Sequence, residues 1–167
     1  MNFGFLDKTS KVTPLLVRLY DSRRLNGLVK DQGAASKSEL TEAICELLEM
    51  DVSAREAELV ADVMIGLLRQ AELDLRQSLA ARLASYDNVP LRLVLHLVND
   101  EISVAAPMLS QSTVLSDLDL VYIIKSQPAE YWQYIATREN LSDQVMNMLA
   151  DTGDLYTAIR PVSYTHL

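Results

Sequence analysis

The sequence has little of what builds sheets, disulfide frameworks or membrane spans. Among 167 residues there are two Phe, one Trp, one Cys, five Gly and five Pro. A single cysteine excludes an internal disulfide and favours a reducing compartment. No apolar run approaches the ~18 residues that a membrane span needs, and residues 1–11 lack the apolar run of a signal peptide. We therefore expect a cytoplasmic protein that does not bind membranes.

Acidic side chains outnumber basic ones, 23 to 15, which gives a formal net charge of −8 at pH 7. The excess is concentrated in residues 74–154, which hold eleven acidic and five basic side chains. A potential of this sign repels phosphate backbones, so nucleic acid is not expected as a partner. A protein or peptide partner with basic side chains fits better.

A strict repeat runs from Arg76 to Asp154. Four apolar columns recur there at 26-residue steps without a gap. They are Val89, Leu115 and Leu141; Leu83, Leu109 and Ile135; Leu97, Ile123 and Leu149; and Val94, Leu120 and Met146. A period of this length, with two helical apolar stripes in each period, is typical of a helix-pair solenoid.

We therefore expect an all-α fold, a right-handed α-solenoid of HEAT-like helix pairs. Residues 1–73 would form an N-terminal helical cap, and residues 74–154 three helix-pair repeats. Residues 155–160 begin a fourth repeat, but the pattern collapses at Pro161. The last residues, 161–167, read like the translation of a sequencing-library adaptor, so we expect a non-native tail and native sequence that ends near Arg160.

Capping signals set the expected helix bounds. Ser36 with Glu39 and Ser53 with Glu56 are spaced as capping boxes, and residues 30–36 read as a loop before the first of them. Pro107 should kink the helix that contains it, or, as the alternative, break it and open a ligand cleft. The cap helices are expected at 13–26, 36–49 and 53–70, and the repeat helices at 71–85, 90–98, 101–111, 116–125, 129–137 and 142–150.

Three segments carry a family resemblance: residues 99–109 with their Val-Ala-x-Pro-x-Leu block, residues 115–120, and residues 135–138. Together they resemble an uncharacterised family of alphaproteobacterial proteins, domain of unknown function 2336. The resemblance covers roughly residues 50–154. It implies an α-solenoid of HEAT-like or leucine-rich-variant repeats, and it carries no activity or catalytic residue that could be transferred.

Motifs for chemistry are missing. There is no glycine-rich phosphate loop, Cys/His metal cluster or nucleophile elbow, so we expect no catalytic residue, no cofactor and no metal. His96 reads as a partly buried structural histidine, and Cys45 as a buried, inert thiol. The paired acids read as helix caps and solvated faces: Asp100 with Glu101, Asp117 with Asp119, and Asp151 with Asp154.

An aromatic cluster is the most interesting local feature. Trp132 stands where the two preceding repeats have Ala80 and Ala106, and core packing is the first interpretation. The second is a partner surface, because Tyr and Trp are enriched at interface hot spots. That surface would consist of Tyr122, Tyr131, Trp132, Tyr134 and Arg138, with Arg92 near it in repeat register.

The favoured function is a non-enzymatic protein–protein interaction or scaffold module. One alternative is a DNA-processing, glycosylase-like enzyme on a HEAT-like scaffold, for which Trp132 with Glu130 or Asp154 would be the candidates. The acidic repeats argue against it, because such an enzyme needs a positive track. A third possibility is a regulatory domain of a longer, truncated protein.

Overall fold

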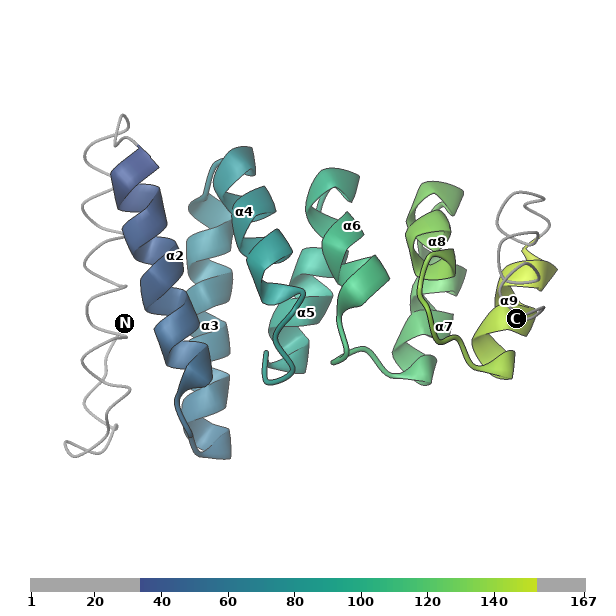
Figure 1. Cartoon of the computed structure of the whole chain (residues 1–167), viewed down its shortest axis with the longest axis horizontal. Coiled ribbons are helices and arrows are strands. Elements are labelled where there is room, and N and C mark those ends of the chain that lie inside the picture. Colours follow the sequence, from purple (N-terminus) through teal and green to yellow (C-terminus); the bar gives the residue numbers. More distant parts are fainter. Residues whose placement is uncertain (1–33, 153–167) are drawn as a thin grey trace. The chain divides into compact units, whose positions relative to one another are not determined.

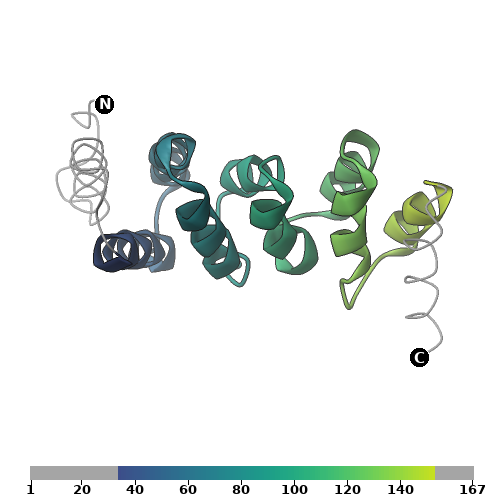
Figure 2. The ribbon, with the colours of Figure 1, turned by 90° about the horizontal axis from the view of Figure 1, so that it is seen from above.

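The computed structural model describes residues 34–152 of the chain. Over that range the chain forms eight helices and no strand, and short connectors join the helices in chain order (Figures 1 and 2). The helices are α2 (Ala34–Glu49), α3 (Ala54–Gln70), α4 (Leu73–Leu83), α5 (Leu91–Val98), α6 (Ile102–Gln111), α7 (Asp117–Ser126), α8 (Ala129–Ala136) and α9 (Asp143–Asp151). The all-α expectation is confirmed for these residues. The helix expected at 13–26 and everything from residue 153 onward lie outside them.

Capping boxes define where two of the helices start. At α3, Ser53 Oγ accepts from the Glu56 backbone N–H and the Glu56 carboxylate accepts from the Ser53 backbone N–H, each at 3.2 Å. At α7, Ser116 and Asp119 exchange the same pair of bonds. Each box satisfies two N–H groups that would otherwise have no partner at the helix start. The box predicted at Ser53 is therefore confirmed.

One predicted boundary is wrong. The helix expected to begin at a Ser36 cap already includes Ala34, the first residue that the structure describes, so residues 34–36 are helical instead of part of a loop. Alanine has the highest intrinsic helix propensity, and two consecutive alanines extend the helix by a few residues beyond the capping signal. The other end, at Glu49, is where the pattern predicts it.

Pro107 lies inside α6 without breaking it, since α6 runs from Ile102 to Gln111 as one helix. Proline lacks the backbone N–H that would bond four residues back, so the helix loses one bond at this point. Ser110 Oγ adds a side-chain bond in the same turn by donating to the Ala106 carbonyl oxygen at 2.9 Å. The alternative of a helix break that opens a ligand cleft is therefore wrong.

The chain divides into two compact units. Unit 1 comprises Met1–Leu79 and Asn88–Leu93, and unit 2 comprises Ala80–Asp87 and Val94–Leu167. In unit 1 the Asn88 side-chain amide donates to the Leu48 carbonyl oxygen, which ties the connector before α5 to the end of α2. Cys45 on α2 is a buried free thiol, as expected.

Packing contacts connect helices α6, α7, α8 and α9 of unit 2. α6 packs against α8, α7 packs against α9, and α8 packs against both α7 and α9. Ten of the twelve apolar column residues of the chain are buried, and the two that are half-buried, Leu141 and Met146, both belong to the last period. Each buried side chain of this size contributes roughly 1.5–3 kcal/mol to folding. The columns therefore form a large share of the core.

A spacing of 26 residues also appears in the backbone and in the polar contacts. α5, α7 and α9 begin at Leu91, Asp117 and Asp143, each 26 residues after the one before. Within unit 2, Thr113 Oγ1 donates to Asp87 Oδ1 at 2.6 Å, a bond between residues 26 apart in the chain. Equivalent connector positions of consecutive periods are thus in direct contact.

Candidate interaction surface

The five residues of the predicted partner surface all belong to unit 2. Tyr122 lies on α7, and Tyr131, Trp132 and Tyr134 lie on α8, with Arg138 in the turn that follows. The structure separates them into two groups. Tyr131 and Arg138 make contacts inside the unit, whereas Tyr122 and Tyr134 are exposed.

Tyr131 belongs to the interior of the unit. The residue is only 9% exposed, and its hydroxyl donates to the Asp100 carbonyl oxygen at 2.7 Å. Burial raises the pKa of the phenol above its ordinary value of 10.0, and the carboxylates of Glu130, Asp100 and Glu101 add to the rise. Tyr131 is thus a core tyrosine with a satisfied hydroxyl, which agrees with the packing interpretation of the aromatic cluster.

Arg138 is engaged by the backbone of its own unit. Its Nε donates to the Leu109 carbonyl oxygen at 2.6 Å, and its Nη2 to that of Met108 at 3.1 Å. Its Nη1 donates to the Ser112 carbonyl oxygen at 2.9 Å. All three acceptors lie at the C-terminal end of α6, where the helix dipole favours a cation, and the Met108 carbonyl oxygen also accepts from the Ser112 backbone N–H. Burial lowers the pKa of the guanidinium. The side chain therefore anchors the turn after α8 to α6, and it offers no donor fork to a partner.

Trp132 is half-buried, so its exposure lies between that of the buried Tyr131 and that of the exposed Tyr122 and Tyr134. Its Nε1–H is enclosed, and none of the residues that the structure describes accepts a hydrogen bond from it. An enclosed donor without an acceptor costs about 1–3 kcal/mol, so apolar packing of the indole must outweigh that cost. The main role of the Trp132 side chain is therefore apolar packing and not a polar contact with a partner.

Tyr122 is highly exposed, and so is its neighbour Leu118, which the sequence analysis did not predict as part of the surface. Tyr122 is 67% exposed, and Leu118, one helical turn before it on α7, is 71% exposed. Residues four apart lie on the same side of a helix. The buried side of α7 is formed by Leu120, Val121, Ile123 and Ile124. The position of Leu118 outside that buried stripe was the signal that could have found it.

We call Asp117, Leu118, Tyr122 and Lys125 the outer face of α7, since all four residues are exposed. On α8, Tyr134 is the third exposed aromatic or large apolar residue of this region, at 40%. The structure thus offers two exposed tyrosines and one leucine in place of the five-residue surface that the sequence predicts.

Acidic side chains dominate the surroundings of this face. The described part of unit 2 holds nine Asp or Glu and three Lys or Arg, a net charge of −6. α9, which packs beside α7, exposes Asp143 and Asp151. Among the residues that the structure describes, Asp117, Asp143 and Asp151 form no ion pair. The net field around the described part of unit 2 is therefore negative.

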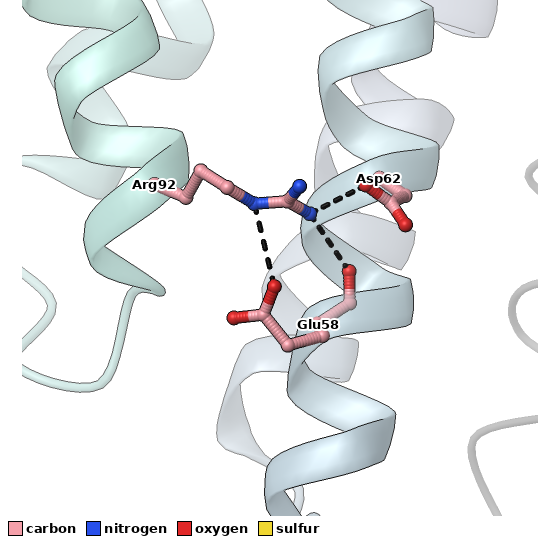
Figure 3. A network of polar contacts seen from close by, with 3 residues as sticks. All are labelled: Glu58, Asp62 and Arg92. Atoms are coloured by element: carbon pink, nitrogen blue, oxygen red, sulfur yellow. Dashed lines mark hydrogen bonds and ion pairs between the residues drawn. The ribbon is translucent and has the colours of Figure 1, made fainter.

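Arg92, expected near the surface in repeat register, belongs to unit 1 and is held there (Figure 3). Its Nε lies 3.4 Å from a Glu58 carboxylate oxygen, and its Nη2 pairs with Asp62 and also donates to the Glu58 carbonyl oxygen. The hydrogen bond to Asp62 and the charges of both carboxylates raise the pKa of the guanidinium, against a smaller opposing effect of burial. Arg92 thus links the start of α5 to α3.

In two of the acidic pairs, one carboxylate bonds a backbone N–H near a helix start. The Asp100 carboxylate accepts from the Glu101 backbone N–H at 2.7 Å, and Asp119 completes the capping box of α7. His96 is half-buried in the last turn of α5, whereas Asp154 lies outside the described residues. Between residues 34 and 152 there is no group of three or more side chains suited to hold a metal ion, and no helix there is long and apolar enough to cross a membrane.

Comparison with known proteins identifies one family. Residues 104–160 match the family model described as an uncharacterised protein conserved in bacteria, DUF2336. No curated protein and no solved structure matches the chain. The match includes the Val-Ala-x-Pro-x-Leu block and the two later segments that carried the resemblance, although it begins further along the chain than residue 50. Residues 104–160 are therefore similar to DUF2336, the family that the resemblance indicated.

Proposed function

We propose that this chain is a non-enzymatic, cytoplasmic interaction module that docks a protein or peptide on the outer face of α7. One observation carries the proposal: Leu118 and Tyr122 expose about two thirds or more of their surface side by side on one helix turn. Neighbouring exposed apolar residues of this kind mark interaction sites more often than single ones do. Tyrosine is also among the residues most enriched at binding hot spots.

The scaffold in this proposal is a right-handed α-solenoid of HEAT-like helix pairs. Three observations support it: the helix starts 26 residues apart, the buried apolar columns, and the Asp87–Thr113 bond between residues one period apart. Arg138 adds a second bond of the same span, to the Ser112 carbonyl oxygen. Stacked repeats present extended surfaces that suit protein partners.

No catalytic role is part of the proposal. Two of the paired acids, Asp100 and Asp119, accept hydrogen bonds from backbone N–H groups near helix starts. Trp132, a candidate of the glycosylase-like alternative, is half-buried with its indole N–H enclosed. A flipped base would need an accessible aromatic face in a positive groove, and the described part of unit 2 has a net charge of −6.

A random-peptide display selection on the full chain tests the proposal. The double variant Leu118→Ser/Tyr122→Ser removes the apolar surface of the α7 face and leaves every charge and every buried contact in place. We expect enriched peptides to bind the wild type and to lose about tenfold or more in affinity on the double variant. Circular dichroism should show equal helix content in both proteins.

Leu73→Ser is the matched control, because Leu73 is also an exposed leucine on a helix but lies on α4 in unit 1. It should leave the affinity of the enriched peptides unchanged. Selection of no peptide, or of peptides that bind the double variant as well as the wild type, would overturn the proposal. Trp132→Ala is a weaker test, since removing a half-buried indole also opens a cavity.

A further inference from the structure

We infer that the segment docked on the outer face of α7 is a basic amphipathic helix, with apolar side chains along one edge and Lys or Arg on both flanks. This inference rests on the proposed function, because it specifies the partner of the same site. It is drawn from the pattern of the exposed side chains around Leu118 and Tyr122 and from the charges that surround them.

The apolar part of the face is small and elongated. Leu118 and Tyr122 are separated by one turn of α7, about 6 Å along the helix axis. The flanking exposed positions of α7 are polar: Asp117 and Lys125 are charged, and Ser126 carries a hydroxyl. A narrow apolar strip with charged ends matches one or two turns of a partner helix that offers apolar residues three or four positions apart. A globular protein with a flat apolar patch would bury much more than this strip.

Charge decides which helix fits. Asp117 lies directly beside the strip, and α9, which packs against α7, contributes Asp143 and Asp151 on exposed positions. The single basic side chain on the outer face of α7 is Lys125. A helix with Lys or Arg beside its apolar edge would find the Asp117 carboxylate next to the strip and a net charge of −6 over the described part of unit 2, whereas an acidic helix would be repelled.

The same charge argues against a second copy of this chain as the occupant. Two copies would each bring a formal net charge of −8, and each would bring the same acidic side chains to the α7 face in a symmetric dimer. Like charges that meet at an interface oppose association. A basic partner removes this repulsion and gains attraction in its place.

Two synthetic helical peptides of equal length provide the probes. Both carry the same leucine edge, and one has lysine and the other glutamate at all remaining positions. Fluorescence anisotropy with the full chain measures binding of each labelled peptide. We expect the Leu/Lys peptide to bind, with an affinity that falls as salt is added, and the Leu/Glu peptide to bind at least about tenfold more weakly.

Variants separate the docking face from general attraction to an acidic protein. Leu118→Ser/Tyr122→Ser keeps all charges, so it should weaken the Leu/Lys peptide about tenfold or more if the peptide uses this face. Asp117→Asn/Asp143→Asn keeps the apolar strip, and we expect a loss of about two- to threefold because exposed ion pairs are weak. Leu73→Ser should bind the peptide as the wild type does.

Three results would overturn the inference, and they differ in what they leave standing. Equal binding of the Leu/Glu peptide, lost on Leu118→Ser/Tyr122→Ser, would reject the basic partner but keep the docking face of the proposed function. Equal binding of the Leu/Lys peptide to all variants, or no binding, would reject the inference, and the display selection alone would then decide the docking face. Sedimentation that shows a wild-type dimer, dissolved by Leu118→Ser/Tyr122→Ser, would identify a second copy as the occupant.

Discussion

Arg92 and Arg138 place the same guanidinium group in two different environments, one in each unit. Arg92 is exposed and pairs with the carboxylates of Glu58 and Asp62 on the surface of α3. Arg138 is half-buried and donates to three backbone carbonyls at the end of α6. Water competes for the contacts of the first and is largely excluded from those of the second. The two therefore differ in how much stability they provide, although both link one helix to another.

The environment of an arginine near a candidate site therefore determines whether its donors are available to a partner. Both residues were candidates for the neighbourhood of a partner surface, and both use their donors within the chain. An exposed ion pair can be exchanged for a partner's carboxylate at little cost, because its own net contribution is small. Withdrawal of the Arg138 guanidinium would remove the donor that it gives to the Leu109 and Ser112 carbonyl oxygens, at a higher cost.

Leu109→Ala should lower the free energy of unfolding more than the substitutions of Arg138, Tyr131 and Arg92. Leu109 is buried, and its carbonyl oxygen also accepts from Arg138. The substitution removes buried side-chain atoms and keeps the carbonyl, so it isolates the apolar part of the contact between α6 and the α8 turn. We expect the free energy of unfolding to fall by about 2–5 kcal/mol. Urea denaturation followed by circular dichroism measures it, and an unchanged midpoint would contradict the assignment of this residue to the core.

Arg138→Met should come second, with a loss of about 2–3 kcal/mol, because the methionine fills similar space but removes the donor of the Leu109 and Ser112 carbonyl oxygens. Arg138→Lys is the matched variant, since it keeps the charge but cannot bond three carbonyls with one ammonium. It should fall between Arg138→Met and the wild type in the same denaturation experiment. If lysine restored full stability, charge rather than the donor fork would be the source of the effect.

Tyr131→Phe tests a neutral donor in the same role, because the Tyr131 hydroxyl also bonds a backbone carbonyl, that of Asp100. We expect a loss of about 1 kcal/mol near neutral pH. The folded pKa of this phenol is raised, so the folded state holds the proton more firmly than the unfolded one. That stabilisation is complete below pH 10.0 and is lost as the pH rises through the folded pKa.

Wild type should therefore lose more stability than Tyr131→Phe when thermal melts are carried above pH 10.0, the ordinary pKa of tyrosine. Below that value the two melting curves should keep a constant separation. An identical decline of both proteins at high pH would show that other tyrosines, and not Tyr131, govern the alkaline loss.

Arg92→Ala should have the smallest effect, a fall in Tm of at most about 2 °C, since exposed ion pairs contribute little. What remains of the effect should disappear at high salt, which screens exposed charges. Arg138→Met, in contrast, should keep its full effect under the same conditions. Thermal melts of both variants at low and high ionic strength make this comparison, and a salt-insensitive loss at Arg92 would remove the distinction between the two arginines.

Much of the local structure could be predicted from the sequence. Capping signals placed the start of α3 behind Ser53, and the 26-residue columns identified core residues such as Leu83, Leu109 and Ile135. These features depend on neighbours within one or two helical turns, which is the range that periodicity describes. The helical conformation of residues 34–36 shows where propensity outweighs a capping signal.

The candidate site was harder to predict, because exposure and polar contacts depend on tertiary structure. Arg138 and Tyr131 bond to carbonyls 26–31 residues earlier in the chain, and no spacing rule specifies such acceptors. The exposed Leu118 was missed for the opposite reason: leucine is usually assigned to the core, and only its position outside the buried stripe of α7 indicates otherwise.

The span of the hydrogen bonds between helices in unit 2 also bears on how this unit folds. Those bonds join residues 26–31 apart, from Asp87–Thr113 to Asp100–Tyr131. Closing such short loops costs little chain entropy, and native contacts of low sequence separation go with fast folding. Each helix pair can dock as soon as its neighbour has formed, so the growing chain can acquire structure period by period as it leaves the ribosome.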